Sequence, residues 1–522
     1  MQTSQSKKGG FTSSIGFILA AAGSAVGLGN LWGFPYKTAD NGGAAFVFLY
    51  IACVLFIGVV TMICEIFIGR RAQANPVTAF KKINKNIGWI GLIAIAVPTI
   101  IVCYYSVLGG YTVKYAFNSF WGNTGNYNNF AGNGLEVTIF TAIFVAMALF
   151  VVMAGVKGGI EKASKVLMPA LFLLLVAVVI FVLCLGEGVV DGLKFYLVPD
   201  FSKITFSSVL AAMGQAFYSL SLGMGAMIVY GSYTGKEINV VKSTGMICIF
   251  DTCVALLAGL AIFPSVFHFA SIEGVAIKDI SMNGATLMFV TLPQVFESIG
   301  YVGNIIEFFF FAMVIIAAVT SVISIMEVAS QFIIQKFKIK RKFATLMVAV
   351  ATFAVSIPVG LSTGGAIDFK IFGQDLLSLF DIITNTVMMP ICAMLSCIAV
   401  GWFIGPKQAI SELEEQGNKF GPLKSIVSIM MKFVAPILIG IIEIFGVIDL
   451  IVPNLFNFSG NGAPIINTAA TFSPNGFGIV LVSYLLIGIL IGVYFAFLKK
   501  RETGTNADEL LDETALDCKT TN

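Results

Sequence analysis

Three glycines interrupt an apolar stretch near the amino terminus of this 522-residue chain. Gly23, Gly27 and Gly29 lie in the middle of residues 13–37, close to a serine and to Asn30. Each glycine costs a helix about 1 kcal/mol relative to alanine, so three of them favour an unwound segment. Unwound carbonyls suit a small cation, and the amino end of the following half-helix suits an anionic group. Close packing of helices through small residues explains this stretch equally well when it is considered alone.

Residues 207–232 form a second apolar stretch that is interrupted in the same way. Helix breakers and small polar side chains thus occur together twice, and we expect the two breaks to face each other across one binding site. The glycines of this stretch are Gly214, Gly223 and Gly225, and its polar residues include Gln215, Ser219 and Ser221.

One helical face in a third apolar stretch carries two hydroxyls. Residues 317, 320 and 321 share this face, because positions three and four apart are neighbours on a helix. The hydroxyls of Thr320 and Ser321, with the nearby carbonyl of Ala317, offer three oxygens to a small hard cation. The alternative is that both hydroxyls bond to carbonyls of their own helix.

Two acidic residues also lie inside apolar stretches. Asp251 lies within residues 241–268, where a central carboxylate costs roughly 2.5–3.5 kcal/mol on insertion scales. No lysine or arginine lies at its depth in that stretch, so a bound cation is the simplest partner, and a protonated or water-facing carboxyl is the alternative. Glu65, within residues 43–69, is expected to be structural and to bond the broken backbone of residues 13–37.

The elements that carry these residues are predicted to be membrane helices. The chain is 57% hydrophobic and 11% charged, whereas soluble domains carry about 25% charged residues. The single histidine, His268, and the scattered cysteines exclude a His- or Cys-rich metal site, and neither enzyme chemistry, a cofactor nor a nucleic-acid partner is expected. Since one crossing needs roughly 20 apolar residues, we predict an all-α integral membrane protein with twelve transmembrane helices. These span residues 13–37, 43–69, 88–117, 136–155, 165–185, 207–232, 241–268, 300–334, 343–360, 374–401, 427–450 and 475–498.

Lysine and arginine gather in alternate loops between these spans, which predicts that both termini are cytoplasmic and that the protein lies in the plasma (bacterial cytoplasmic) membrane. The interrupted first and sixth spans are five apart. Because five is odd, the two five-helix halves run in opposite directions, as inverted repeats do. The predicted organisation is a cytoplasmic segment (1–12), a first repeat (13–185), an inverted second repeat (207–401), two additional helices (427–498) and a flexible cytoplasmic tail (499–522).

Short motifs occur along the chain in a fixed order. They are AGSAVGLGNLWGFP at residues 22–35, Asn41-Gly42-Gly43, Gly69-Arg70, Tyr104-Tyr105, Ser219-Leu220-Ser221-Leu222-Gly223 and Thr320-Ser321. Together they resemble the neurotransmitter:sodium symporters, especially bacterial amino-acid members such as the leucine and tyrosine transporters. The resemblance extends over residues 10–500.

The resemblance implies two sodium ions as coupling ions and one amino-acid substrate. It assigns the first sodium to Ala25, Asn30, Ser219, Asp251 and the substrate carboxylate. It assigns the second sodium to the carbonyls of Gly23, Val26 and Ala317 and to the hydroxyls of Thr320 and Ser321. It assigns the substrate to Ala25, Leu28, Gly29, Ile101, Tyr105, Tyr218, Ser221, Met224, Ser321 and Ile325.

The expected outer gate departs from the family pattern. The arginine that normally follows Trp32 is Gly33 here. The family pattern pairs that arginine with Asp381, with Gln215 also in the gate. We therefore expect Lys37, one helical turn further out, to replace the missing arginine.

Two further departures concern ions and the inner gate. Asp251 stands where many members have asparagine, and its carboxylate could supply the negative charge that chloride supplies in animal members, so we predict chloride-independent transport. At the inner gate, the usual arginine is Lys8 and its usual acidic partner is Gln335. We therefore expect the inner gate to be weaker or to be arranged differently.

The substrate class follows from a few positions. Monoamine carriers of the family have aspartate at the position of Gly27, so glycine favours an amino acid that brings its own carboxylate. Ile101 and Met224 predict an apolar side-chain pocket. The predicted function is sodium-coupled import of a neutral, hydrophobic or aromatic L-amino acid by alternating access, in a lipid bilayer. The alternative is an amino-acid-binding sensor or a channel without concentrative transport, although a channel would need a continuous polar lining.

Overall fold

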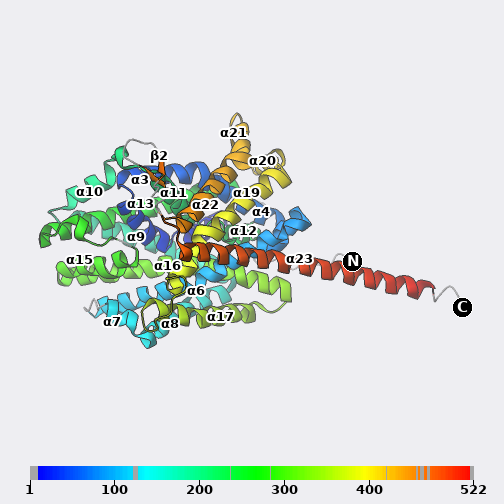
Figure 1. Ribbon diagram of the computed structural model, residues 1–522, viewed down its shortest axis with the longest axis horizontal. Coiled ribbons are helices and arrows are strands. Elements are labelled where there is room, and N and C mark those ends of the chain that lie inside the picture. The colour runs from blue at the N-terminus through cyan, green and yellow to red at the C-terminus, as the bar shows by residue number, and fades with distance from the viewer. Residues whose placement is uncertain are drawn as a thin grey trace.

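The structure is a computed structural model that describes residues 10–121, 127–235, 237–282, 284–418, 420–453, 456–458, 464–466 and 471–517. Its helices pack into one bundle, from which the carboxy-terminal α23 projects (Figure 1). The first part of the chain contains α1 (Ser14–Ala25), η1 (Gly29–Gly33), α2 (Phe34–Asp40), α3 (Ala44–Cys53), η2 (Val54–Gly58), α4 (Val59–Ala72), α5 (Pro76–Ile83), η3 (Lys85–Ile87), α6 (Gly88–Phe120), α7 (Tyr127–Gly132), α8 (Gly134–Met153), η4 (Val156–Ile160), α9 (Glu161–Leu183), α10 (Val189–Leu197) and η5 (Phe201–Lys203).

The second part continues the bundle and adds one short antiparallel hairpin of β1 and β2. The elements are α11 (Phe206–Ser219), α12 (Ala226–Ser232), α13 (Val240–Glu273), η6 (Ile277–Asp279), α14 (Gly284–Thr286), η7 (Leu287–Thr291), α15 (Leu292–Ser298), α16 (Tyr301–Phe337), α17 (Arg341–Thr363), α18 (Leu376–Asp381), η8 (Ile382–Met388), α19 (Met389–Ile398), η9 (Ala399–Ile404), α20 (Pro406–Glu414), α21 (Leu423–Ile429), η10 (Met430–Val434), α22 (Ala435–Ile451), β1 (Phe456–Phe458), β2 (Pro464–Ile466) and α23 (Pro474–Asp517).

The helices confirm the predicted all-α membrane fold. Among the described residues, 10 helices are long and apolar enough to cross a membrane, and up to 11 when the bent pair Ser14–Ala25 and Gly29–Asp40 counts as one span. The sixth predicted span, 207–232, falls on α11 and α12, each too short to cross alone. We take these two half-helices as the remaining crossing of the predicted twelve.

Both predicted breaks are present. The first span bends by 50° where α1 ends, and Val26 has an extended backbone there. In the sixth span, residues 220–225 separate α11 from α12. Ser221, Gly223 and Gly225 have φ angles of 54°, 75° and 67°. Glycine adopts this left-handed region without strain, whereas a serine there is uncommon and marks a constrained site. The glycine pattern therefore predicted unwinding correctly in both spans.

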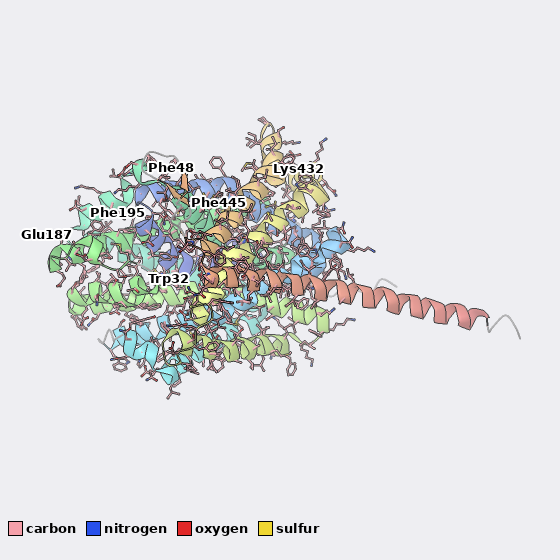
Figure 2. All side chains as sticks on the ribbon, in the orientation of Figure 1. Trp32, Phe48, Glu187, Phe195, Lys432 and Phe445 are labelled. Carbon is pink, nitrogen blue, oxygen red and sulfur yellow. The ribbon has the colours of Figure 1, made fainter. Side chains whose placement is uncertain are left out.

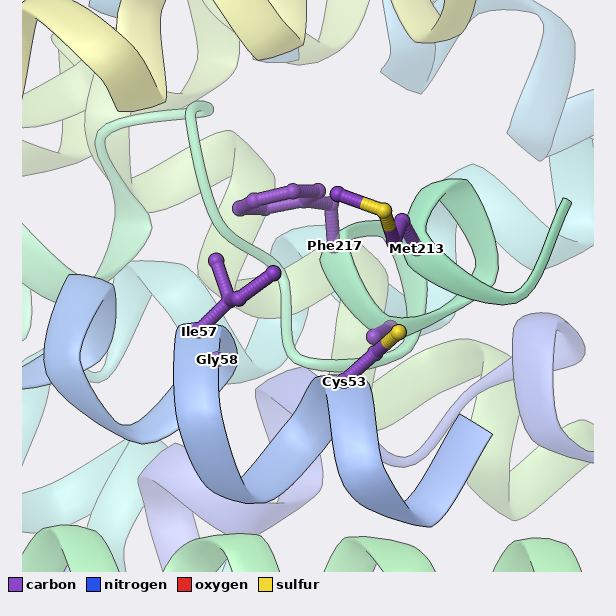
Figure 3. A pocket seen from close by; sticks show the side chains of 6 residues that line it. Cys53, Ile57, Gly58, Met213 and Phe217 are labelled. Carbon is purple, nitrogen blue, oxygen red and sulfur yellow. The ribbon is translucent and has the colours of Figure 1, made fainter. Parts of the chain in front are cut away.

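A small apolar hollow lies beside the second break, between η2 and α11 (Figure 3). A Cβ on Gly58 would lie 2.4 Å from Leu220 Cδ1, so this glycine lets the second span approach the break closely. The hollow contains no polar lining surface and offers nothing to orient a ligand. Its lining residues are Cys53, Ile57, Gly58, Met213, Ala216 and Phe217.

The two ends of the bundle differ in which loops they carry. Glu187 and Phe195 lie at the end opposite to Lys432 (Figure 2). The predicted orientation, with both termini cytoplasmic, stays a prediction. Lys8 lies outside the described residues. Helix α23 continues to Asp517, and the predicted flexibility of the tail from residue 499 onward stays a prediction.

Candidate functional site

A nearly closed pocket with a cavity volume of about 20 Å³ lies between the two breaks. It is closed by α6 and α16, which pack extensively on each other. Every residue predicted to bind substrate lines it except Leu28, whose backbone N–H donates to Tyr105 Oη at 3.1 Å beside it. Ser24 and Gly27 also line it, which the sequence had not assigned. The lining residues are Ser24, Ala25, Gly27, Gly29, Ile101, Tyr105, Tyr218, Ser221, Met224, Ser321 and Ile325.

The glycines of the first span allow the pocket walls to approach one another. A Cβ on Gly27 would lie 2.6 Å from Ser321 Oγ and 2.8 Å from Tyr105 Oη. A Cβ on Gly29 would lie 2.7 Å from the Tyr218 ring. Close approach and unwinding, the two explanations that the sequence left open for these glycines, therefore operate at the same place.

Asp251 lies next to this pocket in a cluster of neutral hydrogen-bond donors. Asn30 Nδ2 donates to Asp251 Oδ1 at 2.8 Å and to Ser219 Oγ at 2.9 Å. Ser219 Oγ donates to Asp251 Oδ2 at 2.6 Å. Tyr50, a fourth member that the sequence gave no signal for, donates to Asp251 Oδ2 at 3.4 Å. All four side chains are fully buried.

This cluster has the chemistry of a cation site. A buried carboxylate whose partners are an amide and hydroxyls keeps its negative charge uncompensated, which is costly unless a cation or proton joins it. Carboxylate, amide and hydroxyl oxygens are ligands that hard cations prefer. The structure thus brings together Asn30, Ser219 and Asp251 as expected, with Ala25 in the adjoining pocket wall.

The oxygens predicted for a second cation also converge. Ser321 Oγ donates to the carbonyls of Val26 at 3.0 Å and Gly23 at 3.3 Å. Thr320 Oγ1 donates to the Ala317 carbonyl at 3.0 Å. The alternative of bonding within the helix therefore applies to Thr320, whereas Ser321 reaches across to the first span.

The residues expected at the outer gate lie above the pocket. Gln215 Nε2 donates to the Gly29 carbonyl at 2.7 Å, and a Cβ on Gly33 would lie 3.4 Å from Gln215 Oε1. Lys37 and Asp381 form no ion pair within 4.0 Å among the described residues: the Lys37 ammonium lies 5.9 Å from the centre of the Tyr36 ring, and the Asp381 carboxylate accepts from Asn385. Gly33, the position at which the family pattern has arginine, thus lies close to Gln215.

Asp381 has further neutral partners in this region. Asn385 Nδ2 donates to the Asp381 carboxylate and to Tyr104 Oη, the latter at 3.3 Å. Asn385 lies in η8, the π-helical segment that directly follows Asp381. The tenth span therefore presents an acid and an amide toward the first and third spans.

The expected partner of Glu65 is wrong. Glu65 Oε1 accepts the backbone N–H of Gly223 at 2.8 Å, so it bonds the break in the sixth span and not the break in the first. The carboxylate is fully buried in α4, which packs closely on α12. Its structural character is as expected, but sequence order gave no measure of which break lies nearer.

The opposite end of the bundle contains an ion pair that the sequence missed. Glu327 of α16 is fully buried and pairs with Arg341, the first residue of α17. Tyr233 Oη donates to Glu327 Oε1 at 2.6 Å, and Arg341 Nε donates to the Val152 carbonyl at 2.9 Å. Gln335, the expected gate position, instead accepts bonds from Asn75. Arg341 lies in a basic loop where its sequence neighbours gave no reason to single it out.

Comparisons with known proteins agree with this geometry. A sequence model described as "Sodium:neurotransmitter symporter family" matches residues 8–131 and 128–496. The chain is 34% identical over 450 residues to YhdH of Bacillus subtilis (strain 168), which is described as an uncharacterized sodium-dependent transporter. This match covers 84% of the present chain and 98% of YhdH. It is 23% identical over 465 residues to the sodium- and chloride-dependent GABA transporter 2 of Rattus norvegicus, covering 79% of this chain and 76% of that one.

A solved structure has the same fold. The crystal structure of MhsT in complex with L-phenylalanine superposes with a TM-score of 0.76 at 35% sequence identity, covering 84% of this chain and 100% of MhsT. The family match spans both broken helices, the pocket and the oxygen clusters. The chain is therefore a sodium-dependent membrane transporter, not an enzyme, and it belongs to the sodium:neurotransmitter symporter family.

Proposed function

We propose that the protein imports a neutral L-amino acid with an apolar side chain together with sodium. The observation that carries this proposal is the mixed lining of the pocket between the breaks. The Tyr105 hydroxyl and the adjacent Leu28 amide provide polar groups, while Ile101, Met224 and Ile325 provide apolar surface. MhsT, whose structure holds L-phenylalanine, supports the same substrate class.

The pocket lining offers a partner for each part of an amino acid. The substrate carboxylate would accept from the amides of Leu28 and Gly29 and from Tyr105 Oη, at the amino end of the half-helix that begins with η1. Its ammonium would bond the carbonyls of Ala25 and Tyr218 and the hydroxyl of Ser221. The pocket lining contains no ionisable side chain that is charged at neutral pH, so a charged substrate side chain would lose its hydration without gaining a partner.

Sodium would couple to this substrate at two places. The first ion would lie among Ala25, Asn30, Ser219 and Asp251, where the substrate carboxylate would complete its ligands. The second would lie among the carbonyls of Gly23, Val26 and Ala317 and the hydroxyls of Thr320 and Ser321. Each inward charge is driven by about 2.3 kcal/mol per 100 mV of membrane potential.

Chloride independence is part of the proposal. Asp251 places a permanent carboxylate beside the proposed first sodium, so a mobile anion is not needed to offset the cation in this buried region. The rat relative, by contrast, is described as sodium- and chloride-dependent.

Alternating access would use the two broken spans as moving parts. We propose two inverted five-helix repeats, 13–185 and 207–401, that share the central site, with both termini cytoplasmic in the plasma membrane. Lys37, Asp381 and Gln215 would close the outer side. The Glu65 bond to Gly223 would hold the unwound backbone of the sixth span during this motion.

Uptake into proteoliposomes tests the function. Vesicles containing the purified full chain should concentrate labelled L-phenylalanine or L-leucine when sodium is high outside, and not when choline replaces sodium. Replacing chloride with gluconate should leave the initial rate unchanged. Downhill flux that ignores sodium would identify a channel, and saturable binding without accumulation would identify a sensor.

A further inference from the structure

Two buried serines connect the first span to α16 beneath the pocket. Ser24 Oγ donates to Ser324 Oγ at 2.7 Å, and the two residues are 2% and 0% exposed. Ser324 Oγ donates to the Ser321 carbonyl at 2.7 Å. Because a hydroxyl has one proton, the donor direction runs from Ser24 through Ser324 to the backbone of Ser321.

Ser24 also contacts the substrate side of the site through its backbone. Its carbonyl accepts from Ser221 Oγ at 2.8 Å, and it lines the pocket. Ser221 lies in the unwound part of the sixth span with φ 54°, a conformation that non-glycine residues adopt mainly where the surroundings impose it. One residue of α1 is therefore bonded to the broken sixth span on one side and to α16 on the other.

The α16 side of this connection leads to the proposed second cation site. Ser321 Oγ donates to the carbonyls of Val26 and Gly23, which are also proposed ligands of that ion. A cation bound there needs the lone pairs of all three oxygens, so the Ser321 proton must turn away from both carbonyls. The bond from Ser24 to Ser324 involves none of these atoms and can persist while the Ser321 hydroxyl reorients.

We propose that the Ser24–Ser324 hydroxyl pair couples the substrate pocket to the second cation site. The substrate ammonium would order Ser221 and the Ser24 carbonyl, which holds the last turn of α1 in place. The serine pair in turn holds this turn of α1 against the residues of α16 that would bind the ion. If bound substrate raises the sodium affinity of that site by some factor, bound sodium raises the substrate affinity by the same factor. This inference rests on the symport function proposed above. Ser24 and Ser324 act as positioning residues, because the effect passes through the backbone of α1 and the hydroxyl of Ser321.

Equilibrium binding of ²²Na⁺ to the purified full chain, with and without saturating L-phenylalanine, measures the coupling. Ser24→Ala and Ser324→Ala each remove the pair from one end, so either variant tests it if the other does not fold. Ser396→Ala is the matched control, because Ser396 is equally buried but donates only within its own helix, to the Cys392 carbonyl at 2.9 Å. A thermal unfolding curve for each variant verifies folding.

We expect both test variants to bind sodium alone with nearly the wild-type affinity. L-phenylalanine should increase the sodium affinity of the wild type. In each test variant this increase should be smaller by a factor of about three to ten, the range expected for the loss of one buried hydrogen bond. Part of the coupling should survive, through the substrate carboxylate at the first sodium. Equal tightening in the wild type and both variants would overturn the inference alone. A wild type whose sodium affinity ignores both L-phenylalanine and L-leucine would overturn the proposed symport and the inference together.

Discussion

Asn30 Nδ2 lies 2.8 Å from Asp251 Oδ1, and this contact joins the break in the first span to the middle of α13. The side-chain oxygen of Asn30 meanwhile accepts the backbone N–H of Gly27 at 3.1 Å. The amide protons thus occupy the position beside the carboxylate that a cation would take. Binding of sodium there would replace a neutral donor with a full positive charge, which is why the charge of Asp251 should determine sodium affinity.

Asp251→Asn keeps the size of the side chain and removes its charge. We expect the sodium concentration for half-maximal uptake to rise by about tenfold or more, which corresponds to about 1.4 kcal/mol of lost attraction. Added chloride should partly restore the rate, because a mobile anion can offset the buried cation. The measurement is initial uptake against sodium concentration in chloride and in gluconate. An unchanged sodium dependence would remove Asp251 from the cation site.

Gly27→Ala tests whether the first break forms the substrate pocket. The added methyl group would lie within 3 Å of both Ser321 Oγ and Tyr105 Oη, so we expect substrate affinity to fall about tenfold to a hundredfold. Gly214→Ala is the control, because a Cβ at Gly214 meets nothing within 4 Å although this glycine also precedes a break. Equal losses in both variants, measured as binding of labelled L-phenylalanine, would mean that helix propensity and not the pocket controls affinity.

Local sequence predicted the parts of this site that depend on spacing along one helix. The glycines around Gly27 and Gly223 predicted both breaks, and the spacing of Thr320 and Ser321 from Ala317, three and four residues, predicted a shared face. These features follow from the period of a helix and from the low helix propensity of glycine. The complete ligand sets came from the motif resemblance, since together they combine residues of five separate spans.

Contacts between side chains of different spans could not be predicted from the sequence. Glu65 was assigned to the wrong break because sequence order does not tell which break lies nearer to its helix. Tyr50 and Ser24 are ordinary residues of apolar helices until folding places them beside Asp251 and Ser324. Such pairs depend on the rotation of one helix against another, which periodicity does not specify.

Lys37 and Asp381 should act together as the outer gate. Lys37→Met and Asp381→Asn are each expected to speed dissociation of bound L-phenylalanine about twofold to fivefold, the range for an attraction between two partly exposed charges. The double variant should be no faster than the single ones, because each change removes the same attraction. Stopped-flow release in sodium measures the rates. Strictly additive effects would show that the two residues act independently.

Glu327 and Arg341 should close the opposite end of the bundle. Arg341 fastens α17 to α16 through Glu327 and to the end of α8 through the Val152 carbonyl, and Tyr233 brings the end of the sixth span to the same carboxylate. Arg341→Gln leaves a fully buried carboxylate without its cation. We expect a loss of about 1–3 kcal/mol of stability, seen as a lower thermal unfolding midpoint.

Glu327→Gln separates gating from stability. It removes the charge and keeps one acceptor oxygen for either Tyr233 or Arg341. Because no unpaired carboxylate is left buried, unfolding should change less than in Arg341→Gln. Opening toward this end should nevertheless become easier, because the ionic part of the contact is lost. A thiol reagent can report this opening by modifying a cysteine placed nearby. Position 233 is unsuitable, because replacing Tyr233 would itself break the contact with Glu327. The reporter is therefore Phe11→Cys, because the backbone N–H of residue 11 donates to the Tyr233 carbonyl. Faster labelling of this cysteine in the Glu327→Gln background, slowed again by sodium with L-phenylalanine, is the expected result. Identical labelling rates in both backgrounds would mean that the ion pair stabilises the fold without controlling access.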